Sequence, residues 1–217
     1  MMVGMGRRHV VVGWLRPQDT CVKPVLATER LTLRRFVPAD VGNLLALDGD
    51  PHVMLFLDRN TRSRAEIEAT VLPRFLSYYE RYRDFGVWAA ETRADSRFVG
   101  WFALTPVTPS EGPIVKWSES VDQTSIVEIG YRLRRDARGY GYATEVTRAL
   151  VRHAFTHLDV EEIVATTMTV NQASRRVMEK AGLRYTRTLF LEWPDPLEGS
   201  ECGEVEYGLR RDDWTRS

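Results

Sequence analysis

A glycine-rich turn in this 217-residue chain combines residue types and spacing that are suited to binding phosphate groups. Directly after a predicted strand and directly before a predicted amphipathic helix, the chain reads Arg138-Gly139-Tyr140-Gly141-Tyr142-Ala143-Thr144-Glu145. Glycine lets a backbone approach a ligand closely. The first amides of a helix have no intrahelical acceptor and lie at the positive end of the helix dipole. A strand, a glycine turn and a helix in this order therefore favour binding of a pyrophosphate.

The same turn can also be interpreted as an ordinary tight turn, in which the glycines are needed only for the backbone conformation. Positive charge nearby comes from Arg132, Arg134, Arg135 and Arg138, although each is also an ordinary solvated side chain. The turn lacks the Gly-Lys-Ser/Thr ending of a Walker loop and the full Gly-x-Gly-x-x-Gly dinucleotide pattern. We therefore favour pyrophosphate binding, but not by an ATP-binding loop of the Walker type.

The bulk composition narrows the class of protein. Hydrophobic residues make up 43% and charged residues 28% of the chain, as in globular proteins. Thirty basic residues balance thirty acidic ones, so the whole molecule has no net attraction to nucleic acid or to an anionic membrane. Cys21 and Cys202 predict neither a disulfide framework nor a thiolate metal cage, and a cytoplasmic location is the simplest expectation. His153 and His157 lack a third ligand, so no metal site is predicted.

Hydrophobic periodicity predicts the elements that position the turn. Strands are predicted at residues 31–36, 87–91, 98–104, 126–133, 163–169, 184–192 and 204–209. Helices are predicted from residue 38, from the capping box Ser63–Glu66, and over 144–158 and 172–181. Pro73 is expected to kink or restart the second of these helices. Residues 106–124, with two prolines and a glycine in their interior, are expected to form a long loop.

The order of these elements is β-α-α-β-β-β-α-β-α-β-β. Residues 126–169 form a β-α-β unit, which normally joins parallel strands by a right-handed crossover, whereas the other strands can be antiparallel. The sequence therefore predicts an α/β (mixed α+β) fold with one core. We expect residues 25–217 to form a single domain and residues 1–24 an N-terminal extension.

Three segments resemble the GNAT superfamily of N-acetyltransferases. Arg138-x-x-Gly141-x-Ala143 matches its Arg/Gln-x-x-Gly-x-Gly/Ala signature, which binds the pyrophosphate of acetyl-coenzyme A in that family. The run from Asn171 to Leu183 and the opening Thr28-Glu29-Arg30-Leu31-x-Leu33-Arg34 resemble the Rim-type branch of ribosomal-protein N-terminal acetyltransferases. The resemblance spans roughly residues 26–214. It implies a central mixed sheet with helices on both faces and acetyl-coenzyme A as cosubstrate.

The resemblance also implies which residues hold acetyl-coenzyme A. The backbone of the strand at residues 131–133 would face the pantetheine arm, and Asn171 would hydrogen-bond it. Arg175 and Arg176 are candidates for the 3′-phosphate, with solvation the alternative for each. The predicted cofactor-binding residues are Tyr131, Arg132, Leu133, Arg138, Gly139, Tyr140, Gly141, Tyr142, Ala143, Thr144, Asn171 and Arg176.

Glu128 is the predicted general base. Acetyl transfer to an amine requires that the acceptor ammonium lose a proton. Alternation along the strand places Glu128 on the same face as Gly130, and the glycine leaves room for a ligand beside the carboxylate. In this family a glutamate at this strand position often serves as the base. A structural ion pair with an arginine is the alternative.

Ser174 is the predicted donor of a proton to the leaving thiolate. Many enzymes of the family use a tyrosine further along this helix, at the position where this chain has Met178. That departure strengthens Ser174 as the candidate, as in the Rim-type branch. Unassisted departure of the thiolate, and a serine that merely bonds backbone amides at a helix terminus, are the alternatives.

The acceptor is predicted only as an amine. Trp117 and Trp193 flank the two long loops where the family receives acceptors and are the predicted substrate contacts, with ordinary packing as the alternative. Rim-type resemblance favours a protein N-terminus, followed by a small-molecule amine such as a polyamine, an amino acid or an aminoglycoside-like compound. A non-catalytic acyl-coenzyme A sensor is the rival class. No nucleic acid or membrane partner is predicted, and a homodimer is left open.

Overall fold

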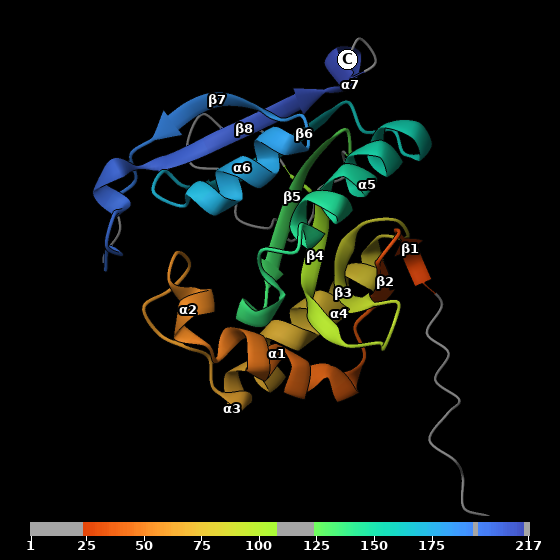
Figure 1. The fold of residues 1–217 in the computed structure, drawn as a ribbon, viewed down its shortest axis with the longest axis vertical. Helices are drawn as coiled ribbons and strands as arrows, with labels where there is room; N and C mark the ends of the chain where they lie inside the picture. Colours follow the sequence, from red (N-terminus) through yellow and green to blue (C-terminus); the bar gives the residue numbers. More distant parts are fainter. Residues whose placement is uncertain (1–23, 108–123, 193–194, 215–217) are drawn as a thin grey trace, which may run out of the picture.

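One eight-stranded sheet organises the computed structural model, which describes residues 24–107, 124–192 and 195–214 (Figure 1). The strands are β1 (Pro24–Ala27), β2 (Leu31–Arg35), β3 (Gly86–Thr92), β4 (Phe98–Pro106), β5 (Ile126–Leu133), β6 (Glu162–Met168), β7 (Arg184–Leu189) and β8 (Glu204–Arg210). The α-helices are α1 (Val41–Asp48), α2 (Pro51–Met54), α3 (Arg64–Glu66), α4 (Leu72–Arg81), α5 (Tyr142–His157), α6 (Gln172–Lys180) and α7 (Arg211–Trp214). Four further turns of 3-10 or π-helix are η1 (Pro38–Asp40), η2 (Ile67–Val71), η3 (Arg135–Ala137) and η4 (Ser200–Cys202).

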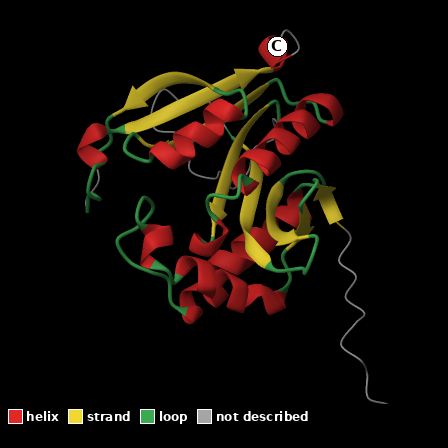
Figure 2. Cartoon of the chain, viewed as in Figure 1, coloured by secondary structure: helices red, strands yellow, loops and turns green. Residues whose placement is uncertain are grey.

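The sheet has the strand order β1-β2-β3-β4-β5-β6-β8-β7. All neighbours in it are antiparallel except β5 and β6, which are parallel and are connected through α5. Figure 2 shows the strands in yellow and the helices in red. This confirms the β-α-β unit predicted for residues 126–169. The pairing of β5 with β6 is confined to Ile126–Glu128 opposite Glu162–Val164. Beyond Glu128 the two strands are no longer paired, so the sheet has a gap at its centre.

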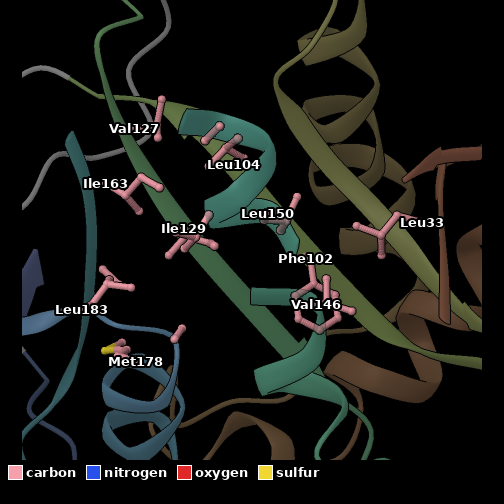
Figure 3. Close-up of a cluster of buried hydrophobic side chains, with 14 of the residues drawn as sticks. Leu33, Phe102, Leu104, Val127, Ile129, Val146, Leu150, Ile163, Met178 and Leu183 are labelled. Carbon is pink, nitrogen blue, oxygen red and sulfur yellow. The ribbon is translucent and has the colours of Figure 1, made fainter. Parts of the chain in front are cut away.

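Two hydrophobic clusters attach helices to opposite faces of the sheet. The first joins α5 and α6 to the sheet and includes Leu33, Phe102, Ile129, Val146, Leu150, Met178 and Leu183 (Figure 3). The second joins α1, η2 and α4 to the other face and includes Leu44, Leu47, Ile67, Phe75, Ala89 and Trp101. Because successive side chains of a strand point to opposite faces, the same strands contribute to both clusters. The predicted mixed sheet with helices on both faces is confirmed.

One local signal in the first helical region behaves as predicted. The Ser63 hydroxyl accepts a hydrogen bond from the Glu66 amide at 3.2 Å, and the Glu66 carboxylate accepts one from the Ser63 amide at 2.7 Å. This is the capping box read from the sequence. Pro73 has no amide proton to donate, and the chain approaches it through the π-helical turn η2 before α4 begins. The helical run from Arg64 to Arg81 is continuous, so the structure accommodates the proline with a local π-helical turn and does not break the helix.

The structure also contains elements that periodicity did not predict. β1 has only four residues and is held by its pairing with β2. α2 is equally short, and its cap is the Asp50 carboxylate, which accepts from the His52 amide at 2.8 Å. α5 begins at Tyr142 rather than near Thr144, and β7 ends at Leu189. Elements this short do not complete enough periods to be recognised from sequence alone.

Candidate functional site

A cavity of about 660 Å³ lies where β5 and β6 part. Its walls come from β4, β5, β6, α6, the start of α5 and the segment after α2. On one side it is lined by the glycine turn and α6, which pack on the first face of the sheet. On the other side it is lined by Trp101 and Ala103, which belong to the cluster on the second face. The cavity therefore connects the two faces of the sheet through the gap between the strands.

The glycine turn presents bare backbone to this cavity. Gly139 and Gly141 have left-handed conformations, with φ values of +85° and +81°, which glycine adopts without steric cost. A Cβ atom added at Gly139 would meet nothing within 4 Å, and one at Gly141 would meet only the guanidinium of Arg30, at 3.5 Å. Gly141 is also the N-cap of α5. The first amides of a sixteen-residue helix thus begin at an open wall of the cavity.

Two residues of the loop between β1 and β2 hold this turn in place. The Arg30 guanidinium pairs with the Glu145 carboxylate at 2.6 Å and donates to the Tyr140 carbonyl at 2.8 Å. It also lies over the Tyr142 ring, 4.9 Å from the centroid. The Thr28 hydroxyl donates to Glu145 at 2.6 Å. Burial acts to raise the pKa of Glu145, but the hydrogen bonds from Thr28 and Arg30 outweigh it, so the pKa is lowered and the carboxylate stays charged.

Arg138 joins the turn to its neighbours. Its guanidinium donates to the Leu133 carbonyl at 3.4 Å and to the His52 carbonyl at 3.2 Å. Burial lowers the pKa of Arg138, although an arginine remains charged at neutral pH. A guanidinium carries five N–H donors, so these two bonds leave others for a ligand. Arg138 therefore supplies positive charge at the wall where the helix amides begin.

Ser174, in the first turn of α6, is held by three polar contacts. The Tyr131 hydroxyl lies 3.0 Å from the Ser174 hydroxyl and 3.0 Å from its carbonyl oxygen. The Asn171 side chain accepts from the Ser174 amide at 3.2 Å and donates to the Thr167 hydroxyl at 3.0 Å. Burial raises the pKa of Tyr131 to about 12, so its phenol stays protonated. Met178, one helical turn beyond Ser174, also lines the cavity and has no proton to donate.

Glu128 occupies the last paired position of β5 before the gap. Its carboxylate accepts a hydrogen bond from the Thr166 hydroxyl at 3.2 Å, and the residue opposite it on β4 is Thr105. Glu128 is partly buried and lines the cavity. It shares the face of β5 with Arg132, whose guanidinium forms an ion pair with buried Asp48 and lies over the Trp101 ring. Arg132 is therefore paired with Asp48 on this face of the sheet.

Most of the residues proposed from sequence are brought together here. Those that line the cavity are Glu128, Tyr131, Arg132, Leu133, Arg138, Gly139, Gly141, Tyr142, Ala143, Thr144, Asn171, Ser174 and Arg176. Tyr140 does not line it: its side chain is exposed and stacks on Tyr142. Arg175 turns toward the Tyr207 hydroxyl and the Thr169 carbonyl. Trp117 and Trp193 lie outside the described residues.

Sequence reasoning missed several residues of this site. Thr28 and Arg30 belong to the first-strand pattern of the family resemblance, and in the structure they contact the glycine turn. Phe56 and Leu57 line the cavity from the segment after α2, and Thr105 lines it from β4. The side chain of Tyr131 contacts Ser174, whereas the family resemblance implied a role only for the Tyr131 backbone. These contacts join residues that lie far apart in the sequence, so the residue pattern of one segment does not predict them.

No helix among the described residues is long and apolar enough to cross a bilayer. No group of three or more histidine, cysteine, aspartate or glutamate side chains in residues 24–107, 124–192 and 195–214 is arranged to hold a metal ion. His153 and His157 stack on each other, with ring centroids 5.1 Å apart.

Known proteins resemble this chain in sequence and in fold. The family model described as acetyltransferase (GNAT) domain matches residues 30–184. The FsC-acetyl coenzyme A-N(2)-transacetylase of Aspergillus fumigatus is 36% identical over 195 residues, which cover 89% of this chain and 79% of that protein. Among solved structures, RimL, a ribosomal L7/L12 alpha-N-protein acetyltransferase in complex with coenzyme A, has a TM-score of 0.68 at 18% identity and covers 88% of this chain and 99% of its own. The aminoglycoside enzyme AAC(6')-Ib, solved with parmomycin and acetyl-coenzyme A, has a TM-score of 0.64 at 20% identity, covering 87% of this chain and 98% of its own. With a family match over most of its length, the chain belongs to the GNAT family of acetyltransferases.

Proposed function

We propose that this chain, as an acyl-coenzyme A-dependent N-acetyltransferase, moves the acetyl group of acetyl-coenzyme A to the primary amine of a small molecule. The observation that carries the proposal is the cavity through the sheet. It has a helix N-terminus with open glycines on one side and a carboxylate, Glu128, on the other. A two-substrate transfer needs both sites within reach of one another.

The first side of the cavity fits acetyl-coenzyme A. The open backbone at Gly139 and Gly141, the start of α5 and the Arg138 guanidinium form a positively polarised wall for the pyrophosphate. Unpaired backbone of β5 beyond Glu128 faces the gap, where the pantetheine arm can lie as an additional strand. Asn171 lines this part of the cavity, and Arg176 is the candidate for the 3′-phosphate. Bound there, acetyl-coenzyme A supplies a thioester that is activated for acyl transfer.

Glu128 and Ser174 are proposed to handle the two proton transfers. Glu128 takes a proton from the acceptor ammonium, which frees the nitrogen lone pair for attack on the thioester carbonyl. Ser174 gives a proton to the departing thiolate. The contact with Tyr131 supports that role by holding the Ser174 side chain in place, because the two hydroxyl oxygens lie 3.0 Å apart. Burial raises the pKa of Tyr131 to about 12, so the phenol stays protonated and donates its proton to the Ser174 carbonyl.

A contact between two loops supports a small acceptor over a protein terminus. Arg59, in the segment between α2 and α3, forms an ion pair with Asp195 at 3.0 Å and donates to the Pro196 carbonyl. Phe56 and Leu57 of the same segment line the cavity. The bridge joins this segment to the loop after β7, and we take a restricted approach to the cavity from this side as support for an amine on a small molecule. The name of the 36% identical relative, an N(2)-transacetylase, points the same way.

A panel of acceptors tests the proposal. Purified protein and acetyl-coenzyme A are mixed with spermidine, kanamycin, L-ornithine or an alanyl peptide with a free amino terminus, and thiol release is followed. At least one small amine is expected to be acetylated with a higher kcat/KM than the peptide, with the acetyl group located on nitrogen by mass spectrometry. Acetylation of the peptide alone would overturn the choice of acceptor. Bound coenzyme A without transfer to any amine would overturn the proposed reaction.

Arg30→Ala is expected to weaken binding of coenzyme A about three- to tenfold, on the order of 1 kcal/mol. The substitution removes the contacts that Arg30 makes to Glu145 and Tyr140 and leaves the glycine turn less firmly placed. Calorimetric titration with coenzyme A measures the effect. Arg93→Ala is the matched control, because Arg93 donates to the carbonyls of Thr28 and Glu29 but not to the turn. Equal losses in both variants would contradict a specific role for Arg30.

A further inference from the structure

Thr105, on β4, carries a buried hydroxyl. It is 1% exposed and lies near the end of β4, in a run whose other members are almost all apolar. Its Oγ1 has no hydrogen-bond partner in the structure. The residue lines the cavity. A buried hydroxyl without a partner is unfavourable, so one that faces a ligand cavity indicates that a ligand completes its hydrogen bonding.

The position of Thr105 points to the reacting amine. It is the direct partner of Glu128 in the antiparallel pairing of β4 with β5. Side chains at directly opposite positions lie on the same face, with Cβ atoms about 4.5–5.5 Å apart. Thr166 flanks Glu128 from β6, but its hydroxyl already donates to the Glu128 carboxylate. Thr105 is therefore the hydroxyl beside Glu128 whose lone pairs remain for a donor.

We propose that Thr105 and Glu128 together form the subsite for the acceptor nitrogen and that this subsite selects primary amines, an inference that rests on the proposed function. A primary ammonium has three N–H donors. One gives its proton to the Glu128 carboxylate, and a second donates a hydrogen bond to Thr105 Oγ1. After the proton has passed to Glu128, the neutral amine reorients about its hydrogen bond to Thr105, so that the freed lone pair faces the gap between β5 and β6, where the proposed function places the thioester.

The atoms balance as follows. The nitrogen lone pair forms the new C–N bond, the C–S bond breaks, and the thiolate receives a proton from Ser174. The nitrogen loses two protons in all: one passes through Glu128 to solvent, and the other replaces the proton that Ser174 gave. A primary amine keeps one N–H in the amide product, so its bond to Thr105 persists throughout the reaction. A secondary amine has no N–H left in the product and loses that bond.

Thr105→Val tests the subsite, because valine keeps the shape of threonine and removes the hydroxyl. Transfer is measured for n-butylamine and for N-methylbutylamine, and for the best acceptor of the panel. We expect kcat/KM for the primary amines to fall about tenfold or more, as expected for loss of a hydrogen bond to a charged group. The value of kcat/KM for the secondary amine should fall less, so the ratio of the primary-amine value to the secondary-amine value should decrease. KM for acetyl-coenzyme A should not change, and Thr105→Ser should restore most of the activity.

Thr147→Val is the matched control. Thr147 is also fully buried with an unpartnered hydroxyl, but it lies in α5 and does not line the cavity. The melting temperature of both valine variants should equal or exceed that of the wild type, and only Thr105→Val should alter transfer. Unchanged kcat/KM and unchanged preference in Thr105→Val, with an active wild type, would overturn the subsite and leave the proposed function standing. A wild type that transfers to no amine would overturn both.

Discussion

Glu128→Gln is expected to lower kcat for amine acetylation about 10²- to 10⁴-fold, the usual contribution of a positioned acid or base. Glutamine keeps the size of the side chain and can still accept the hydrogen bond from Thr166, but it cannot take a proton from an ammonium. Because the proposed function places Glu128 beside the acceptor and the glycine turn beside acetyl-coenzyme A, binding of acetyl-coenzyme A should be preserved. Steady-state kinetics with the best acceptor, alongside calorimetric titration of the cofactor, measures both quantities.

Glu204→Gln provides the control for this prediction. Glu204 is another partly buried glutamate of the sheet, on β8, and burial raises the pKa of its carboxyl group, yet it does not line the cavity. Its substitution should leave kcat near that of the wild type. If Glu128→Gln kept full turnover, the proton would have to leave the amine by another route, and Glu128 would serve only to hold Thr166 and shape the acceptor side.

The separation of β5 from β6 is the feature that would let one sheet bind both proposed substrates. If the two strands were paired along their whole length, their hydrogen bonds would close the sheet and divide the face proposed for the cofactor from the face proposed for the acceptor. Pairing that stops at Glu128 leaves the backbone of the following residues available to a ligand. It also puts the carboxylate at the edge of the opening. The position of Glu128 therefore follows from where the pairing ends.

Periodicity and caps predicted much of this architecture because those signals are local. The bounds of β5 agree with the prediction, and the start of α6 at Gln172 follows from its Asn171 cap. The glycines of the turn could be recognised from the sequence because a left-handed backbone at a position strongly favours glycine there. In the same way, Glu128 could be placed on a face from the alternation of its own strand.

The contacts that complete the site could not be predicted in that way. Arg30 meets Glu145 across 115 positions of sequence, and Tyr131 meets Ser174 across 43. Such pairs depend on how the helices pack on the sheet, which the pattern of one segment does not contain. Thr105 could not be predicted from the sequence either, because threonine is common in strands. Only the structure shows its neighbours and its unpartnered hydroxyl.

Gly141→Trp is expected to weaken binding of acetyl-coenzyme A at least about 100-fold, which corresponds to about 2.7 kcal/mol. Gly141 lines the cavity and caps α5, and a side chain there would start beside the helix amides, in contact only with the Arg30 guanidinium at 3.5 Å. An indole group would occupy the wall where the pyrophosphate is proposed to bind. The left-handed backbone adds a cost of roughly 1–2 kcal/mol for a residue with a Cβ, so a control for strain is required.

Gly182→Trp supplies that control and separates strain from obstruction. Gly182 follows α6 with a φ of +97°, and a Cβ added there would meet only Leu209, at 3.7 Å. It does not line the cavity. Both variants should therefore lose similar stability in thermal unfolding, whereas only Gly141→Trp should lose the cofactor. If Gly141→Trp bound acetyl-coenzyme A as tightly as Gly182→Trp, the pyrophosphate would not lie at this turn. The open glycines would then serve only to join η3 to α5, the plainer interpretation of the same residues.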